Sequence, residues 1–222
     1  MKIVIIDYGA GNIQSIKFAI QRLGFESVLT DDVNEIIAAD KVIFPGVGEA
    51  SSAMHKLKAS GLDALIPKLK QPVLGICLGM QLMCNSSEEG DTKGLGVFDV
   101  DVIKFSNSVK VPQIGWNQVT ELQTDLFKAI PEKEYIYLVH SYYAPLCLET
   151  IATCEYGVSY SAALQKDNFY GTQFHPEKSS TIGAQILKNL CLFIFQQIRV
   201  NWMSVKSINT LVLSRIGGKK EP

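Results

Sequence analysis

Short, unbroken apolar runs alternate with helix-like segments through the first third of the sequence. The clearest runs are residues 3–6, 41–44 and 73–76, and residues 27–29 form a shorter extended segment. Continuous runs rich in Val and Ile are typical of strands that are buried on both faces of a parallel sheet. Helical periodicity follows these runs at 12–23, 33–39, 48–57 and 62–69 and from 78 onward. The alternation predicts an α/β fold, with an open, mainly parallel twisted sheet flanked by helices.

The middle of the chain has a different character, with many strand-like segments and few helices between them. These segments are residues 97–105, 115–122, 134–143, 151–157, 160–166 and 169–174. They predict an additional antiparallel strand layer or edge. A last helix is expected over 181–198. Because no repeat or linker interrupts the pattern, we expect a single domain over 1–198, followed by a tail, 199–222, that matches no motif.

The charge and cysteine content narrow the class of protein. Lys and Arg total 21 against 22 Asp and Glu, so the net charge of −1 favours neither nucleic acid nor an anionic membrane as a partner. No stretch reaches the roughly 18 apolar residues of a membrane span, and the N-terminus lacks a signal-peptide core. Five cysteines without a C-x-x-C pair indicate neither a disulfide framework nor a zinc ribbon. We therefore expect a cytoplasmic protein that needs no metal or cofactor.

Cys77 stands between two glycines, Gly75 and Gly79, where an apolar run meets a helical segment. G-x-C-x-G is the thiol counterpart of the nucleophile elbow, in which small neighbours permit a sharp strand-to-helix turn that exposes the nucleophile. The start of a helix also favours a thiolate. The alternative for a single cysteine is a small buried apolar side chain. We assign that alternative to the other four, Cys84, Cys147, Cys154 and Cys191.

A thiol nucleophile needs a base, and His175 is the best placed of the three histidines. Pro176 disfavours a helix at His175, so the segment is expected to stay extended, with His175 and Glu177 on the same side. A carboxylate at Glu177 would orient the imidazole in a Cys-His-Glu triad. The alternative is that this segment is only a solvated strand end. His140 lacks a carboxylate nearby in sequence and is expected to line the site or to pack structurally, and His55 is expected at the surface.

Acyl transfer also needs backbone N–H groups that face the developing oxyanion. The segment "PGVG" follows a buried strand and offers Gly46, Val47 and Gly48, and the N–H of Leu78 lies directly after the nucleophile. An ordinary strand-to-helix turn explains the same segment equally well.

Together, "PGVG", "GICLGMQLM" and "FHPEKS" resemble the class I glutamine amidotransferase family, whose glutaminase domains have a flavodoxin-like sheet and a Cys-His-Glu triad. The resemblance implies hydrolysis of L-glutamine to glutamate and ammonia. It assigns Cys77 as the nucleophile, His175 as the general base and then acid, and Glu177 as the residue that orients it. The positions that match glutamine-binding residues are Gly48, Gln81, Glu89, Ser141 and Tyr142.

Within that family, "DYGAGNIQS", "SSEEGDTKGLG", "IGWN" and "VHSYY" resemble the glutaminase subunits of imidazole glycerol phosphate synthases over roughly residues 1–197. This implies a heterodimer with a barrel-type cyclase subunit that receives the ammonia and makes imidazole glycerol phosphate and AICAR in histidine biosynthesis. The positions that match partner-facing residues are Asn12, Trp116, Asn117 and Lys178. Gln113 departs from the pattern, because family members commonly carry a histidine there.

Two alternatives remain open on the sequence. A paralogous glutaminase could serve amidino-sugar, anthranilate, aminodeoxychorismate or vitamin B6 synthesis. A non-catalytic regulatory module could share the fold, although the intact Cys77, His175 and Glu177 argue against it.

Overall fold

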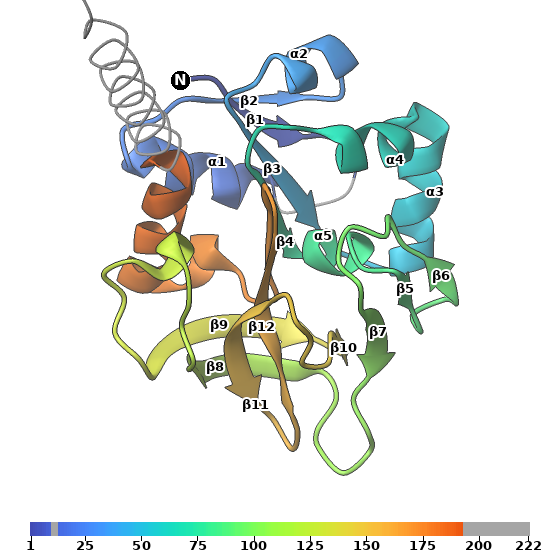
Figure 1. Ribbon diagram of the computed structural model, residues 1–222, viewed down its shortest axis with the longest axis vertical. Helices are drawn as coiled ribbons and strands as arrows, with labels where there is room; N and C mark the ends of the chain where they lie inside the picture. Colours follow the sequence, from blue (N-terminus) through green and yellow to red (C-terminus); the bar gives the residue numbers. More distant parts are fainter. Residues whose placement is uncertain (10–12, 193–222) are drawn as a thin grey trace, which may run out of the picture. The chain divides into compact units, whose positions relative to one another are not determined.

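A seven-stranded sheet with the strand order β11-β12-β13-β4-β3-β1-β2 forms the centre of the fold (Figure 1). The computed structural model describes residues 1–9 and 13–192, and Met1–Leu190 form one compact unit. The strands of this sheet are β1 (Ile3–Ile6), β2 (Ser27–Thr30), β3 (Lys41–Gly46), β4 (Val73–Cys77), β11 (Thr150–Glu155), β12 (Ser159–Lys166) and β13 (Phe169–Thr172). In the described part of the chain, no helix is long and apolar enough to cross a membrane.

Five adjacent strands, β2, β1, β3, β4 and β13, run parallel to one another. The strand β12 runs antiparallel to both of its neighbours, β11 and β13. Every residue of β1, β3 and β4 is buried, as expected for parallel strands that are covered on both faces. The α/β prediction with a mainly parallel sheet is therefore confirmed.

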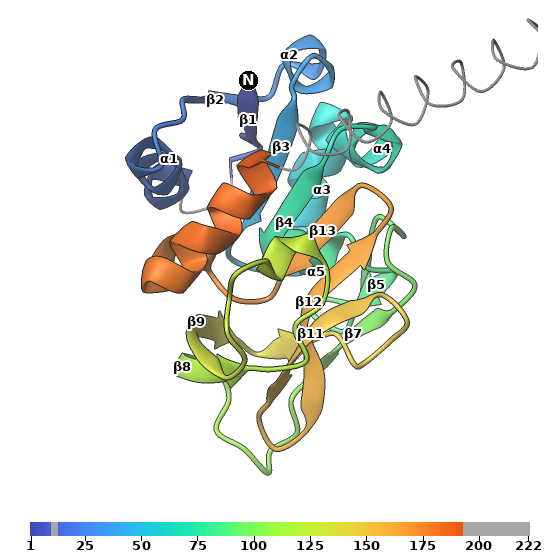
Figure 2. The ribbon, with the colours of Figure 1, turned by 60° about the vertical axis from the view of Figure 1, so that its left-hand side comes forward.

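Helices cover the two faces of the sheet. On one side lie α1 (Ile13–Arg22) and a helix over residues 180–190, and on the other lie α3 (Ala50–Ser60) and α4 (Leu62–Leu65) (Figures 1 and 2). Side chains alternate along a strand. Val4, Ile6 and Phe44 accordingly belong to the apolar cluster that also contains α3 side chains.

The strand-rich middle of the chain is divided between sheets. Its last three predicted segments join the central sheet as β11, β12 and β13 and form its antiparallel edge, and the earlier segments form two further small sheets, in one of which β5 runs parallel to β7. One has the order β10-β7-β5-β6, and β8 pairs with β9 in the other. Their strands are β5 (Ser86–Ser87), β6 (Thr92–Lys93), β7 (Asp101–Lys104), β8 (Gln113–Val119), β9 (Glu134–His140) and β10 (Tyr142–Tyr143). The remaining short elements are α2 (Val33–Ile37), α5 (Leu78–Leu82) and three 3-10 turns, η1 (Ile66–Lys68), η2 (Asp125–Phe127) and η3 (Pro176–Lys178).

Several predicted boundaries were wrong. The helix expected over 48–57 begins at Ala50 and ends at Ser60, where Gly61 adopts a left-handed conformation. The helix expected over 62–69 divides into α4 and η1, whose second residue is a proline. The strands β5 and β6 are only two residues long and carry no periodic signal. The last helix begins at residue 180, and its predicted end, the tail 199–222 and Asn12 lie outside the described residues.

The start of α5 packs directly against the end of β3. A Cβ atom at Gly79 would overlap the backbone carbonyl oxygen of Phe44, and one at Gly46 would overlap the backbone of Gly79. Gly46 and Cys77 are also paired across β3 and β4. Glycine is therefore required at both positions by the close approach of two backbones rather than by their φ angles.

Gly79→Ala is expected to destabilise the protein by about 1–3 kcal/mol, because an overpacked methyl group would have to displace the backbone of β3. The free energy of unfolding from urea denaturation measures this. Leu148→Ala is the control, since the Leu148 side chain is fully exposed and its loss should leave the stability nearly unchanged. Equal losses in the two variants would contradict the proposed backbone contact.

Candidate active site

Cys77 occupies the turn between β4 and α5 in a strained backbone conformation. Its φ of 54° and ψ of −110° lie in a region that non-glycine residues rarely adopt. Strain of this kind persists only where the surrounding structure imposes it, and it concentrates at functional sites. The side chain is 7% exposed and borders a cavity. The predicted strand-to-helix turn at Cys77 is therefore confirmed.

His175 and Glu177 form a buried pair beside this turn. The His175 Nδ1–H donates to Glu177 Oε1 over 2.8 Å, with side-chain exposures of 3% and 1%. The predicted contact is present, but the predicted extended segment is wrong. Only His175 is extended, whereas Glu177 lies in the 3-10 turn η3, which folds the carboxylate back onto the ring.

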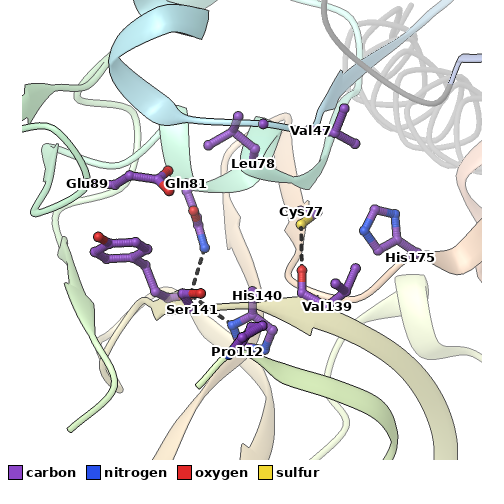
Figure 3. Close-up of a pocket in the computed structure, with 12 residues that line it drawn as sticks. Val47, Cys77, Leu78, Gln81, Glu89, Pro112, Val139, His140, Ser141 and His175 are labelled. Carbon is purple, nitrogen blue, oxygen red and sulfur yellow. Dashed lines mark hydrogen bonds between the residues drawn. The ribbon is translucent and has the colours of Figure 1, made fainter. Parts of the chain in front are cut away.

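The backbone of His175 is held by β9. Its N–H donates to the carbonyl of Tyr137 over 3.0 Å. The Ser179 hydroxyl donates to the His175 carbonyl and accepts from the Tyr137 N–H, at 2.7 and 2.9 Å. These three hydrogen bonds join η3 to β9 and fix the imidazole beside Cys77 (Figure 3).

The surroundings of His175 favour its protonated form. Burial acts to lower the pKa of the imidazole, but the hydrogen-bonding and charge interactions with Cys77 and Glu177 outweigh it and raise the pKa from 6.5 to about 9. The imidazole therefore carries its second proton at neutral pH, where it can be delivered to a leaving group.

A cavity of about 300 Å³ opens over Cys77 and His175 (Figure 3). Every residue predicted to bind glutamine lines it, as do three of the four residues predicted to form the oxyanion hole; the fourth, Gly46, is not among the lining residues. These residues are Val47, Gly48, Leu78, Gln81, Glu89, Ser141 and Tyr142. They come from the segment after β3, from α5, from the segment after β5 and from the β9–β10 junction, so chain segments far apart in sequence meet at one cavity.

The polar side chains at the cavity are already oriented by the protein. Gln81 uses both N–H bonds of its amide, on the carbonyl of Tyr142 and on Gln173 Oε1, each over 2.8 Å. Only its Oε1 remains to accept a bond from a ligand.

Glu89 accepts from the backbone N–H of Ala50 over 2.9 Å, at the first turn of α3. Burial raises the pKa of its carboxyl group, the Ala50 N–H opposes that effect, and Glu49 adds to it. Together with Gln81 Oε1, the carboxylate suits a ligand ammonium group.

His140 both lines the cavity and packs structurally, as predicted. Its Nδ1–H donates to the carbonyl of Tyr142 over 2.8 Å, and its Nε2 lies 3.3 Å from the Tyr160 hydroxyl. Burial lowers the pKa of His140 to about 4; the bond to Tyr142 opposes this effect, and the nearby His175 adds to it. His140 is therefore neutral at physiological pH.

Three residues at the site were missed in the sequence. Pro112 and Val139 line the cavity, and the Cys77 Sγ–H donates to the Val139 carbonyl over 3.8 Å. Gln173 is fully buried, and its Nε2 donates to Cys77 Sγ over 3.8 Å. Its position two residues before His175, at the end of β13, was the signal that could have revealed it.

Three other cysteines, Cys84, Cys154 and Cys191, are buried. Burial raises the pKa of Cys84 far above its ordinary value and that of Cys154 to about 12. All three are core side chains, as predicted, whereas Cys147 is only half-buried.

The predicted partner-facing residues do not share one surface. Trp116 is 52% exposed, and its ring meets Tyr137 edge-on, with 5.9 Å between centroids. Lys178 Nζ lies 5.9 Å from the centroid of the same Tyr137 ring. Asn117 follows Trp116 in β8, so its side chain points to the opposite face, where it donates to the Glu155 carbonyl.

Gln113, the position that departs from the family pattern, is buried. Its Oε1 accepts from the Tyr160 hydroxyl over 3.0 Å, and Gln113 pairs with His140 across β8 and β9. Its amide therefore holds Tyr160, whose hydroxyl also faces His140.

The fold and this site define a class I glutamine amidotransferase. The family model for glutamine amidotransferase class-I matches residues 4–193, and the chain belongs to this family. Among relatives, the chain is 55% identical to imidazole glycerol phosphate synthase subunit HisH of Bacteroides fragilis, over 85% of this chain and 98% of the relative. It is 48% identical to the protein of the same name from Colwellia psychrerythraea, over 85% and 91% of the two chains.

Solved structures share the fold at low sequence identity. A Thermoplasma acidophilum protein assigned to GMP synthase superposes with a TM-score of 0.68 at 20% identity, covering 93% of this chain and 98% of that one. PurLQS from Thermotoga maritima gives a TM-score of 0.65 at 18% identity, with 87% and 98% covered.

The ionisation of His175 can be tested by NMR titration of the imidazole ¹³C signals of the three histidines. We expect His175 to titrate near pH 9 and His140 near pH 4. In Cys77→Ala the pKa of His175 should fall substantially, because burial remains while an interaction that favours the cation is lost. A His175 signal that is unchanged in this variant would contradict the pairing, and His55→Gln assigns the exposed histidine.

The same ionisation links pH to stability. The pKa of His175 is higher in the folded than in the unfolded protein, so its contribution is fully present below pH 6.5 and is lost as the pH rises to about 9.

Proposed function

We propose that this chain is the glutaminase subunit of an imidazole glycerol phosphate synthase. It hydrolyses L-glutamine to glutamate and ammonia and supplies the ammonia to a barrel-type cyclase subunit, which makes imidazole glycerol phosphate and AICAR in histidine biosynthesis. The observation that carries the chemistry is the strained Cys77 beside the buried His175–Glu177 pair at one cavity. The pathway rests on the relatives named HisH, which this chain matches over nearly their whole length.

In the proposed reaction, Cys77 Sγ attacks the side-chain amide carbon of glutamine as a thiolate. Backbone N–H groups of the Gly46–Gly48 segment and of Leu78 stabilise the oxyanion. His175 gives its proton to the amide nitrogen, the C–N bond breaks, and ammonia leaves a thioester on Cys77. His175 then removes a proton from water, which attacks the thioester and releases glutamate and the thiolate. Glu177 holds the imidazole in position throughout.

We assign recognition of the glutamine α-ammonium group to Glu89 and Gln81 Oε1. Ser141 and Tyr142, which line the same cavity, are assigned to the remainder of the substrate, and Gly48 to its backbone contact. This assignment is supported by the hydrogen bonds that leave Gln81 only an acceptor. The Tyr8 hydroxyl donates to the Pro45 carbonyl over 2.9 Å and supports the oxyanion segment.

We propose that the partner docks on the exposed face of the β8–β9 sheet. Ile114, Trp116 and Tyr135 are exposed on this face, and Lys178 lies beside it. Val139 is on the same face and also lines the cavity, which supports transfer of ammonia from Cys77 toward this surface. Asn117 lies on the opposite face and would support the docking surface indirectly, through its hydrogen bond to the Glu155 carbonyl. Asn12 is assigned to the interface from the sequence resemblance.

The proposed chemistry needs a reduced thiol at Cys77, which a reducing compartment maintains. We therefore place the protein in the cytoplasm.

Cys77→Ala is expected to abolish glutamine-dependent turnover while the fold and the complex remain intact. Glutamate release and formation of imidazole glycerol phosphate are measured in the co-purified complex with the barrel subunit. The variant complex should still form product when ammonium chloride replaces glutamine. Cys147→Ala is the control and should keep its activity. Undiminished glutamine turnover in Cys77→Ala would refute the nucleophile assignment.

Trp116→Ala and Lys178→Ala are expected to weaken binding of the barrel subunit by about 10- to 100-fold each, the usual effect of removing an interfacial anchor. Asn117→Ala should act more weakly, because its side chain faces away from the surface. Isothermal titration calorimetry measures the Kd. Leu148→Ser, at a fully exposed apolar residue elsewhere, is the control. Wild-type affinity in both the Trp116 and the Lys178 variant would place the interface elsewhere.

A further inference from the structure

We propose that Gln173 is a further catalytic residue, whose amide N–H donates to Cys77 Sγ and stabilises the thiolate in an orientation that is set by Gln81 and the carbonyl of Tyr142. Gln173 is fully buried, lies directly after β13 and was absent from the residues predicted from sequence. The inference rests on the proposed glutaminase function and concerns how its nucleophile is prepared.

The hydrogen bonds determine which end of each amide points where. The Tyr142 carbonyl can only accept, so the group of Gln81 that contacts it must be Nε2. The second hydrogen of this Nε2 is donated to Gln173 Oε1 over 2.8 Å. The Nε2 of Gln173 is therefore the group that faces Cys77 Sγ, at 3.8 Å. If the Gln173 amide were flipped, its N–H group would face the N–H group of Gln81, and its oxygen would face the Cys77 sulfur. Both contacts would be unfavourable.

The start of this chain of hydrogen bonds is itself held in place. The Tyr142 carbonyl accepts a second bond from the His140 Nδ1–H over 2.8 Å. His140 is buried, and the Tyr160 hydroxyl faces its other nitrogen. Two donors on one carbonyl, both from buried side chains, leave little freedom for Gln81 or Gln173 to rotate.

The titratable groups beside the sulfur are His175, whose cation favours the thiolate, and the buried Tyr8. The two uncharged hydrogen-bond partners of the sulfur act in opposite directions. The Val139 carbonyl accepts from the S–H and so favours the neutral thiol. The Gln173 N–H donates to the sulfur and so favours the thiolate, the form that attacks the substrate. Removal of Gln173 would leave the carbonyl opposed by His175 alone and shift the balance toward the unreactive thiol.

The same chain reaches the substrate. Gln81 lines the cavity and has only its Oε1 available to a ligand. A ligand donor on that oxygen would polarise the Gln81 amide and strengthen its bond to Gln173. Gln173 therefore joins the substrate-binding wall of the cavity to the nucleophile.

The test compares Gln173→Met, which keeps the length but has no donor, with Gln173→Glu, which places only oxygen atoms near the sulfur. The probe is iodoacetamide, and alkylation of Cys77 is followed against pH by mass spectrometry of its peptide. We expect the pH midpoint of alkylation to rise by about one unit in Gln173→Met, the effect of losing one charge-assisted hydrogen bond, and further in Gln173→Glu. In the complex, kcat for glutamine should fall about tenfold, with KM changed much less.

Gln165→Met, which removes a partly buried amide on β12 that contacts Tyr170, is the matched control and should change neither quantity. Near-ultraviolet circular dichroism verifies that each variant is folded, and Gln173→Glu serves if Gln173→Met is not. An unchanged alkylation profile in a folded variant overturns the role of Gln173 and leaves the glutaminase function standing. Glutamine turnover that survives Cys77→Ala would instead overturn the proposed function itself.

Discussion

The close contact between the first turn of α5 and the end of β3 is the constraint on which the rest of the site depends. Gly79 and Gly46 let two backbones approach within a distance that a Cβ atom would prevent. The chain must then reverse sharply at Cys77, whose φ of 54° is the local cost of this packing. The same contact brings the Gly46–Gly48 segment beside the sulfur, so the nucleophile and its oxyanion donors are positioned by one packing event.

Around this turn, the protein divides acid–base properties between two buried histidines. His175 has a carboxylate and a sulfur as partners, which raise its pKa to about 9 in spite of burial. His140 has a carbonyl and a hydroxyl as partners, and burial lowers its pKa to about 4. The His175 ring therefore carries a transferable proton at neutral pH, whereas the His140 ring is neutral and holds the cavity wall in place through its hydrogen bond to Tyr142.

The antiparallel part of the chain has two faces with different tasks. One face of the β8–β9 sheet carries Gln113 and His140, which pack with Tyr160 behind the cavity. The other carries exposed aromatic and aliphatic side chains and also Val139, which reaches the cavity. Because successive residues of a strand point in opposite directions, seven residues of β8 are enough to combine a structural wall with an exposed surface.

The sequence by itself determined the parallel sheet, the turn at Cys77 and the candidates His175 and Glu177, because apolar periodicity, glycine spacing and proximity along the chain are all local signals. It also indicated, through resemblance, five of the residues that line the cavity. Only the tertiary structure decided that Glu177 reaches His175 from a 3-10 turn and that Gln173 contacts the sulfur. It also decided that both amide hydrogens of Gln81 are donated within the protein. Each of these depends on hydrogen bonds or turns made when distant segments pack together, and a buried glutamine has no periodicity that distinguishes it from its neighbours. The local chain therefore specifies which groups are available, whereas packing specifies which atoms of those groups face the reaction.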